Sequence, residues 1–495
     1  MADRRDDDAG RPRSERLTGE DLGFWWGDQP RQRTTMAMLL VLDRRPHTAR
    51  LRAAVQRAVD AVPRLRQHVV DAPLDLARPR WEDDPTFDLD FHVRRYAVSH
   101  DDGAPEHATL ADLFATLGPI YERPFDRTRP LWELIELDGP GEGAALFFRL
   151  HHGVADGVGG NAILAALTDA SDVVTSDEDT GAGAAPHVRS REVPGSWDEK
   201  SLGGRLVEAL GHRAEEAFGR ARAVASGAFT LATSPSAWLR GGSIVVDVVR
   251  SLSERGESPI ASFGRSRHLT GFSLPFEPLR KARAQLGGQM VDVMLTAVAG
   301  AFGAWHRAHG YHEASEVMTL VPINLRPRSA QGLDAGLGNR ATGVMVKLPI
   351  GASDPIARFR EIHARVVERK GHPAVEQLPN VAEAIAVLPR PLFRALSLKG
   401  SEAVQLIVTN VPGIMQPRFV AGSRVVGGYP FAPLAPRCPV SVALYGYDGR
   451  LYVGIDADGT AMPDYAEFAK MLEASFRELL AAAGAGIDPA RTDAD

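Results

Sequence analysis

Residues 150–160 read LHHGVADGVGG and join an apolar segment to a glycine-rich turn and a predicted helix. The segment before them, AALFFRLHH over residues 144–152, is apolar almost throughout, which is typical of a buried central strand. The helix is predicted from NAILAALTDA over residues 161–170. Because side chains alternate along a strand, His151 and His152 are expected to point to opposite faces of the sheet. Strand, turn and helix in this order predict an α/β fold with the candidate catalytic residues at the end of a strand.

The polar side chains of this stretch suit proton transfer. A histidine held at a strand end, with an ordinary pKa of about 6.5, can act as a general base that removes a proton from a hydroxyl group. Asp156 follows in the turn, where its carboxylate is expected to brace the strand end. Gly157 is expected to supply a backbone angle that other residues avoid. The candidate catalytic residues are therefore His151, His152, Asp156 and Gly157.

Other kinds of site fit the sequence less well. The two histidines diverge and no third histidine follows at helical ligand spacing, so no metal is expected. The sequence shows no G-x-S-x-G turn for a serine nucleophile, and DGVGGNA lacks both the dinucleotide-binding spacing and a P-loop lysine. Cys438 is the only cysteine, which excludes an internal disulfide and every multi-cysteine metal site and is compatible with a reducing cytosol.

Composition and charge narrow the class of protein further. Of 495 residues, 44% are hydrophobic and 24% are charged, which excludes fibrous and wholly disordered chains. The formal net charge of −6 gives no global electrostatic reason to expect nucleic acid, so an anionic ligand must meet a local patch. No segment reaches the roughly 18 apolar residues of a membrane span, and the charged N-terminus is unlike a signal peptide. We therefore expect a cytoplasmic protein.

Changes in composition divide the chain into two lobes. Residues 1–16 are predicted to be a disordered tail, and residues 17–170 a mixed N-terminal lobe that carries the histidine stretch. Residues 171–200 are rich in Asp, Glu, Thr, Gly, Ala and Pro without apolar periodicity, which predicts a mobile linker. Residues 201–260 have helical spacing and are predicted to form a helical connector, and residues 261–495 a C-terminal lobe.

The spacing of apolar residues predicts the elements of both lobes. In the N-terminal lobe we expect strands over residues 34–44, 87–98, 132–137 and 144–152, with helices near residues 51–70 and 108–117. In the C-terminal lobe the expected strands are HLTGFSLP, EVMTLVPINL, ATGVMVKLPI, AVQLIVTNVPG, CPVSVALYGYDG and RLYVGIDADG. The expected helices there are PLRKARAQLGG, VDVMLTAVAGAFGAWHRAHG, PIARFREIHARVVERKG and PDYAEFAKMLEASFRELLAAAG.

Several strings resemble the motifs of a known family. HHGVADG resembles the HHxxxDG signature of the acyl-CoA-dependent acyltransferase superfamily, which includes chloramphenicol acetyltransferase and the condensation domains of peptide synthetases. RPLWEL, VPINLRP and NVPG (residues 129–134, 321–327 and 410–413) are similar, in the same order, to motifs of the bacterial wax ester synthase/diacylglycerol acyltransferase family. VPRLRQ, GLGN and YGYDGRLYVGIDAD also match its style. The chain departs from the family at Val291-Asp292, where the family often has Asn-Asp, and Asp292 is expected to cap or brace a helix.

The resemblance implies a two-lobed, chloramphenicol-acetyltransferase-like α/β fold with the active-site channel between the lobes. It implies acyl transfer from a long-chain acyl-CoA to the hydroxyl of diacylglycerol or a long-chain alcohol, giving triacylglycerol or wax ester. Acyl-CoA is then a co-substrate and no cofactor is expected. By the same resemblance His152 is the general base, and Asn410 is a candidate substrate-binding residue.

The implied substrates also suggest where the protein acts and what else it could be. An apolar product and a membrane-dissolved acceptor imply reversible contact with the inner membrane face or with lipid droplets, and no nucleic-acid partner. One alternative is an acyltransferase of the same fold that acts on another hydroxyl or on an amine, as in natural-product or condensation chemistry. The other is a catalytically silent, lipid-binding member, against which the complete set His151, His152, Asp156 and Gly157 argues.

Overall fold

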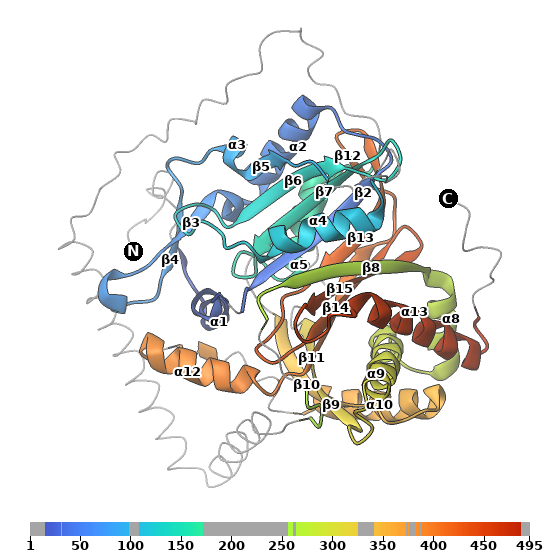
Figure 1. Ribbon diagram of the computed structural model, residues 1–495. Coiled ribbons are helices and arrows are strands. Elements are labelled where there is room, and N and C mark those ends of the chain that lie inside the picture. The colour runs from blue at the N-terminus through green and yellow to red at the C-terminus, as the bar shows by residue number, and fades with distance from the viewer. Residues whose placement is uncertain are drawn as a thin grey trace, which may run out of the picture.

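Two six-stranded sheets form the framework of the molecule, one above the other in the view of Figure 1. The computed structural model describes residues 15–30, 32–98, 108–171, 256–260, 264–324, 341–372, 375, 382–383, 385–386 and 388–486. Except for residue 171, the predicted mobile linker lies outside these residues, as does the predicted helical connector up to residue 255. GLGN and the end of VPINLRP also lie outside them.

The first sheet has the strand order β12-β13-β2-β7-β6-β5. Its strands are β2 (Thr35–Leu42), β5 (Val93–Arg95), β6 (Trp132–Asp138), β7 (Ala144–His151), β12 (Phe419–Val420) and β13 (Ser423–Phe431). Every residue of β7 is buried, and β7 pairs antiparallel with both β2 and β6. The predicted buried central strand is thus confirmed. A separate small sheet, formed by β1 (Glu15–Arg16), β4 (Arg80–Asp83) and β3 (Gln67–Val70), has the strand order β1-β4-β3.

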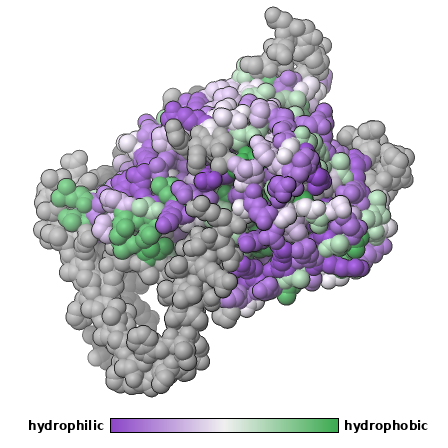
Figure 2. Space-filling view, turned by 60° about the horizontal axis from the view of Figure 1, so that its bottom comes forward, coloured by the Kyte–Doolittle hydropathy of each residue, from purple (hydrophilic) through white to green (hydrophobic). Residues whose placement is uncertain are grey.

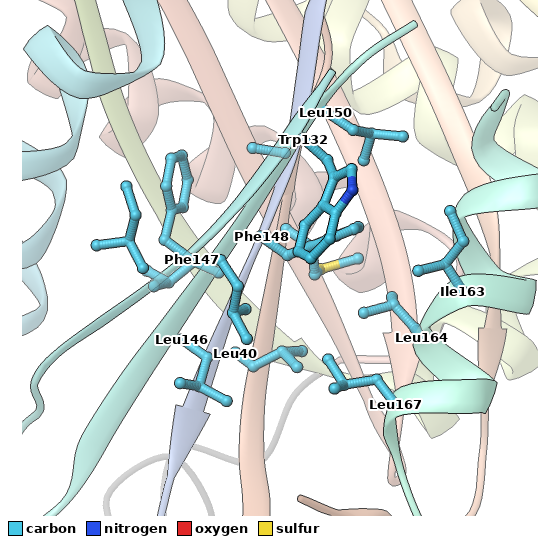
Figure 3. Close-up of a cluster of buried hydrophobic side chains, with 14 of the residues drawn as sticks. Leu40, Trp132, Leu146, Phe147, Phe148, Leu150, Ile163, Leu164 and Leu167 are labelled. Carbon is cyan, nitrogen blue, oxygen red and sulfur yellow. The ribbon is translucent and has the colours of Figure 1, made fainter. Parts of the chain in front are cut away.

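Helices α2 (Thr48–Ala61) and α5 (Gly157–Leu167) contact each other, and α4 (Leu110–Glu122) contacts both β2 and the second sheet. Figure 3 shows Ile163, Leu164 and Leu167 of α5 pointing toward the side chains of the first sheet. All three are at most 5% exposed. Burial of each such side chain contributes about 1.5–3 kcal/mol, so α5 is held in place mainly by its apolar face.

The second sheet has the strand order β10-β9-β11-β14-β15-β8. Its strands are β8 (Arg267–Pro275), β9 (Glu316–Asn324), β10 (Ala341–Pro349), β11 (Leu406–Ile414), β14 (Val440–Tyr447) and β15 (Arg450–Asp458), and they confirm all six strands predicted for the C-terminal lobe. The helices of this lobe include α8 (Phe276–Leu286), α9 (Met290–Ala308), α10 (Pro355–Lys370) and α13 (Tyr465–Ala482). Asp292 caps α9 as expected, because its Oδ2 accepts the backbone N–H of Gln289 at 2.7 Å.

The strand predicted over residues 87–98 is confirmed only at Val93–Arg95 and is wrong for the residues before it. The chain instead forms the short helix α3 (Leu89–His92) followed by the three-residue strand β5. Asp88 Oδ1 accepts the backbone N–H of Asp90 at 2.9 Å and so begins the helical turn. Such local bonds from aspartate compete with strand pairing, which the alternation of apolar and charged residues could not show. The helices α1 (Gly19–Gly27) and α12 (Arg390–Ser401) were not predicted either.

The predicted limits of the lobes also need correction. Glu15 and Arg16 pair with β4, so the tail does not extend to residue 16. Residues 256–260, at the end of the predicted helical connector, are not helical. The strands β12 and β13 follow residue 261 in the chain but belong to the first sheet, where β13 pairs antiparallel with β2. This crossing appears in Figure 1 as orange strands within the blue and cyan sheet. A strand pattern predicts a strand but not the sheet that it joins.

The crossover ties the two lobes together around α5. Arg418, just before β12, donates from Nη2 to the carbonyl oxygens of Thr168 at 2.6 Å and Ala165 at 3.2 Å. Its Nε donates to Thr168 Oγ1 at 2.9 Å. These carbonyls at the C-terminal end of α5 lack partners within the helix. Arg418 therefore fixes the end of α5 from the other half of the chain.

No described helix is by itself long and apolar enough to cross a membrane, and the one pair that passes by length and composition, α8 with α9, is bent by 101°.

Candidate active site

His151 is the last residue of β7 and is only 2% exposed. Its Nδ1 accepts the backbone N–H of Gly153 at 3.0 Å, which places the ring proton on Nε2. Nε2 lies 2.8 Å from Thr34 Oγ1 and donates to it. Burial lowers the pKa of His151 to about 4, so the ring is neutral at physiological pH. Both nitrogens of His151 are therefore engaged by the protein itself.

His152 has different surroundings. It lies in the turn after β7, is half-buried, and donates its backbone N–H to the carbonyl oxygen of Thr34 at 2.7 Å. Its ring stacks on Phe24 of α1, with the ring centroids 3.9 Å apart and the planes within 16°. A stack of this kind fixes the plane of an imidazole ring. The ring of His152 is thus held by α1, whereas His151 is held by the start of β2.

Asp156 is the N-cap of α5 and is 1% exposed. Its Oδ1 accepts the backbone N–H groups of Val158 at 3.1 Å and Gly159 at 2.9 Å. An aspartate N-cap typically stabilises a helix by about 1 kcal/mol. The carboxylate therefore ties the turn that follows the histidines to the first turn of α5.

Gly157 corrects one expectation. It begins α5 and is not among the glycines with a positive φ, so the unusual backbone angle predicted for it is wrong. A Cβ at this position would lie 3.5 Å from Cγ2 of Val411 on β11. That separation is an ordinary van der Waals contact, so the start of α5 faces the second sheet at this point. The histidine stretch therefore lies at the junction of the two lobes.

Asn410 lies on the strand that reaches this junction. It precedes Val411 on β11, pairs with Leu444 of β14 and is exposed. The glycine of the same NVPG string has a structural reason: a Cβ on Gly413 would lie 1.6 Å from the carbonyl oxygen of Gly446. Only glycine permits that approach of β11 to β14. The structure thus brings His151, His152, Asp156 and Gly157 together and places Asn410 next to Val411, the residue that faces Gly157.

Two residues of the site were not predicted from the sequence. Thr34 contacts both histidines, through its hydroxyl and its carbonyl oxygen, and Phe24 carries the stack on His152. The aromatic run Phe24-Trp25-Trp26 was the available signal, since three large rings in succession are unusual near an N-terminus. Their role depends on the contact between α1 and β7, which lie far apart in the sequence.

Other reactive groups give no competing centre in the part of the chain described here. Cys438 is buried, and burial raises the pKa of its thiol to about 12, so it is not a nucleophile at neutral pH. Among the same residues, no three His, Cys, Asp or Glu side chains are arranged to hold a metal ion. The candidate site therefore consists of the hydrogen-bonded His151, the stacked His152 and the start of α5, which Asp156 caps.

Comparison with protein families matches nearly the whole chain. The model of the wax ester synthase/diacylglycerol acyltransferase catalytic domain matches residues 17–294, and that of the WS/DGAT C-terminal domain matches residues 337–480. A Mycobacterium tuberculosis protein with a provisional name as a diacylglycerol O-acyltransferase, Rv2484c, is 32% identical over 470 residues, which are 92% of this chain and 89% of that protein. Another from the same organism, tgs1, is 27% identical and covers 94% of this chain and 96% of its own.

Solved structures with similar folds agree with the two-lobed architecture. The wax ester synthase/diacylglycerol acyltransferase of Marinobacter aquaeolei VT8 superposes with a TM-score of 0.60 at 18% identity, covering 95% of this chain and all of that chain. The first condensation domain of the calcium-dependent antibiotic synthetase has a TM-score of 0.58 at 18% identity, covering 96% and 97%. The predicted fold class is thereby confirmed.

Proposed function

Because the chain belongs to the wax ester synthase/diacylglycerol acyltransferase family, and is thus an acyltransferase, we propose that it esterifies diacylglycerol or a long-chain alcohol with the acyl group of a long-chain acyl-CoA. His152 is the general base in this proposal. Triacylglycerol or wax ester and free coenzyme A are the products. No further cofactor is needed, because the thioester already carries an activated acyl group.

The reaction needs one base that can take up and return a proton. The imidazole of His152 accepts the hydroxyl proton while the alcohol oxygen attacks the thioester carbonyl carbon. The tetrahedral intermediate then collapses, the carbon–sulfur bond breaks, and the imidazolium returns its proton to the departing thiolate. Correct placement of both substrates contributes much of the remaining rate acceleration. Asp156 and Gly157 act as positioning residues, through the turn and the start of α5.

The observation that carries the choice of base is the state of His151. Its Nδ1 lone pair is used by the Gly153 N–H, and its Nε2–H by Thr34. A pKa of about 4 also makes it too weak a base for neutral pH. Of the two histidines in the motif, His152 is the one that is only half-buried. This supports His152 as the base and His151 as the residue that anchors the motif.

The function is tested with purified protein, palmitoyl-CoA and a panel of acceptors: diacylglycerol, hexadecanol, short alcohols and primary amines. Release of free thiol is followed together with the lipid product. Thiol release that depends on diacylglycerol or hexadecanol, with the matching ester formed, is the expected result. Transfer to amines alone would favour the natural-product alternative, and no transfer to any acceptor would favour a silent, lipid-binding protein.

We also propose that the enzyme acts while docked on a lipid surface through α12. Leu392 and Leu396 of this helix are 48% and 44% exposed, and Leu74, in the adjoining turn, is 84% exposed. In Figure 2, where the lower part of Figure 1 is turned forward, the largest apolar areas lie at one side of a mostly hydrophilic face. The sequence of α12, RPLFRALSLKGS, has three basic and no acidic residues. Exposed leucines among cations suit a bilayer that contains anionic lipid.

The same helix is connected to the site. Phe393 is the buried residue of α12, and its ring meets Trp26 of α1 edge-on at 5.1 Å. Two residues earlier on α1, Phe24 stacks on His152. Arg390 at the start of α12 pairs with Asp75, next to Leu74, at 3.5 Å. A surface docked on α12 would therefore hold an acceptor close to the helix that orients the base.

A further inference from the structure

A cavity of about 170 Å³ lies where the lobes meet, lined by Pro30, Arg33, Glu122, Arg265 and Arg267. Pro30 and Arg33 lie between α1 and β2, and Glu122 ends α4, whereas Arg265 and Arg267 introduce β8 of the second sheet. Both halves of the chain thus contribute to one small chamber. Three of the five lining residues are arginines, in a protein with a formal net charge of −6. The cavity is a local basic site of the kind that an anionic ligand would need.

Two of the three arginines of the cavity are paired with carboxylates of the protein. Arg33 lies 3.5 Å from Asp28, and the buried Arg267 lies 3.5 Å from Asp458. The carboxylate of Glu122 is partly used within the cavity wall, because its Oε1 accepts the backbone N–H of Arg267 at 2.6 Å. Arg265 is exposed and forms no ion pair with any residue in the described ranges. Its guanidinium is therefore the cation most open to a ligand.

The wall of this cavity continues directly into the site. Arg33 precedes Thr34, whose hydroxyl lies 2.8 Å from His151 Nε2 and whose carbonyl accepts the His152 N–H. On the other side, Glu122 follows Tyr121, whose hydroxyl donates to the carbonyl oxygen of Thr35 at 2.6 Å. The cationic cavity and the histidine motif are thus held by the same start of β2.

We propose that this cavity binds phosphate groups of the acyl-CoA donor, with Arg33 and Arg265 as the phosphate contacts and Arg267 as part of the wall; this rests on the proposed function. Guanidinium groups bind phosphate oxygens through paired, charge-assisted hydrogen bonds. In acyl-CoA the pantetheine arm separates the phosphates from the thioester, so a phosphate site should lie near the base but not at it. The cavity is connected to His152 through Arg33 and Thr34, which are consecutive in the chain. Its lining offers little apolar surface, which argues against an acyl chain as the occupant.

The test compares two donors that carry the same acyl group. Palmitoyl-CoA has the phosphates, and palmitoyl-N-acetylcysteamine has the thioester without them. For Arg265→Ala we expect KM for palmitoyl-CoA to rise about tenfold, because roughly one charge-assisted contact is lost. For Arg265→Glu we expect a larger rise in KM, because the new carboxylate repels the phosphate. KM for the truncated donor and kcat for both should stay unchanged. Arg280→Ala, which removes an exposed arginine of α8 paired with Glu277, is the matched control and should alter neither donor.

Direct binding separates this inference from the proposed reaction. Calorimetric titration of coenzyme A should show weaker binding to Arg265→Ala than to the wild type, whether or not the wild type turns over. Titration of 3′-dephospho-coenzyme A shows which phosphate is bound. Equal KM values for wild type and Arg265→Ala with palmitoyl-CoA, or equal coenzyme A affinities, would overturn the inference while leaving the reaction intact.

An anionic phospholipid headgroup presents the same phosphate chemistry, so the same variant is tested for flotation with phosphatidylglycerol vesicles. Flotation should not depend on Arg265. If Arg265→Ala weakened flotation and left coenzyme A affinity unchanged, the cavity would be a headgroup site and the assignment to the donor would be wrong. Absence of any coenzyme A binding to the wild type would overturn both this inference and the proposed reaction.

Discussion

His151 and His152 are neighbours in the chain but have opposite surroundings, and the difference comes from single contacts. One ring is enclosed and hydrogen-bonded at both nitrogens, and the other is half-buried and stacked on Phe24. Enclosure lowers the pKa of His151 because the charged ring would lose its hydration. These contacts support the proposed assignment of His151 to anchoring and of His152 to proton transfer.

Substitution separates these two roles. His152→Ala should lower acyl transfer by at least about 100-fold, the typical loss of a general base, with an unchanged unfolding midpoint. His151→Ala should instead lower the free energy of unfolding by about 3 kcal/mol, because the Gly153 N–H and the Thr34 hydroxyl lose their buried partner. Thiol release and thermal unfolding of both variants are the measurements. Near-normal turnover of His152→Ala would contradict the assignment, as would a His151→Ala protein that is inactive yet unfolds like the wild type.

Asp456 of β15 is a second residue whose surroundings oppose its charge. It is 1% exposed, and neither carboxylate oxygen has a hydrogen-bond partner. Burial raises the pKa of this carboxyl to about 7, with Asp458 and Glu122 adding to the rise and Arg267 opposing it. The folded protein thus keeps a proton that the unfolded chain releases near pH 4. This group makes the folded state less stable as the pH rises from about 4 to about 7.

Asp456→Asn should therefore stabilise the protein at pH 8, by up to about 4 kcal/mol, with a gain that shrinks as the pH is lowered to 4. The matched control is Asp458→Asn, which should destabilise at pH 8, because Asp458 pairs with Arg267 and accepts the N–H groups of Thr460 and Ala461. Denaturant unfolding at several pH values measures both variants. A stability difference for Asp456→Asn that did not change with pH would show that the carboxyl is ionised throughout.

At the scale of elements, α1 connects two features that the sequence separates. Its Phe24 orients His152 and its Trp26 receives Phe393 of α12. Two apolar side chains of α12, Leu392 and Leu396, remain exposed. A helix that buries one phenylalanine and exposes two leucines among cations has the pattern of an interfacial helix.

Replacement of both leucines by serine should remove most binding to vesicles of phosphatidylcholine and phosphatidylglycerol, since each exposed leucine contributes apolar area to the interface. Turnover of a water-soluble short-chain alcohol and the unfolding midpoint should stay the same, because neither side chain is buried. Val367→Ser, which removes a 52% exposed valine of α10, is the control and should float normally. Unchanged flotation of the double variant would rule out α12 as the docking helix.

At the scale of the whole molecule, the crossover of β12 and β13 joins the lobes. It inserts strands from the second half of the chain into the first sheet, next to β2. Arg418 at its start holds the C-terminal end of α5, whose N-terminal end carries Asp156 and Gly157. The position of the motif helix therefore depends on both halves of the chain.

Arg418→Ala should lower the free energy of unfolding by about 1–3 kcal/mol, because buried carbonyls at the end of α5 lose a charged donor. It should also lower kcat, since α5 sets the turn that carries His152. Arg418→Lys should restore part of both losses. Arg424→Ala, which breaks an exposed pair with Asp448, should change stability by less than about 1 kcal/mol and serves as control. Thermal unfolding and steady-state kinetics are the measurements. Equal stability and equal kcat for Arg418→Ala and Arg424→Ala would contradict this role of Arg418.

The sequence by itself determined the elements whose signal is local. β7, the six strands of the second sheet and its four long helices follow from apolar periodicity, and the HHxxxDG string gave the candidate site at the end of β7. Where a short side-chain bond competes with periodicity, as at Asp88, the predicted strand was wrong. Tertiary structure alone decided which sheet β12 and β13 join, which ring stacks on His152, and that Arg33 and Arg265 share a cavity. The physical reason is that periodicity records whether a residue faces a core, whereas pairing between distant segments depends on the packing of the whole chain.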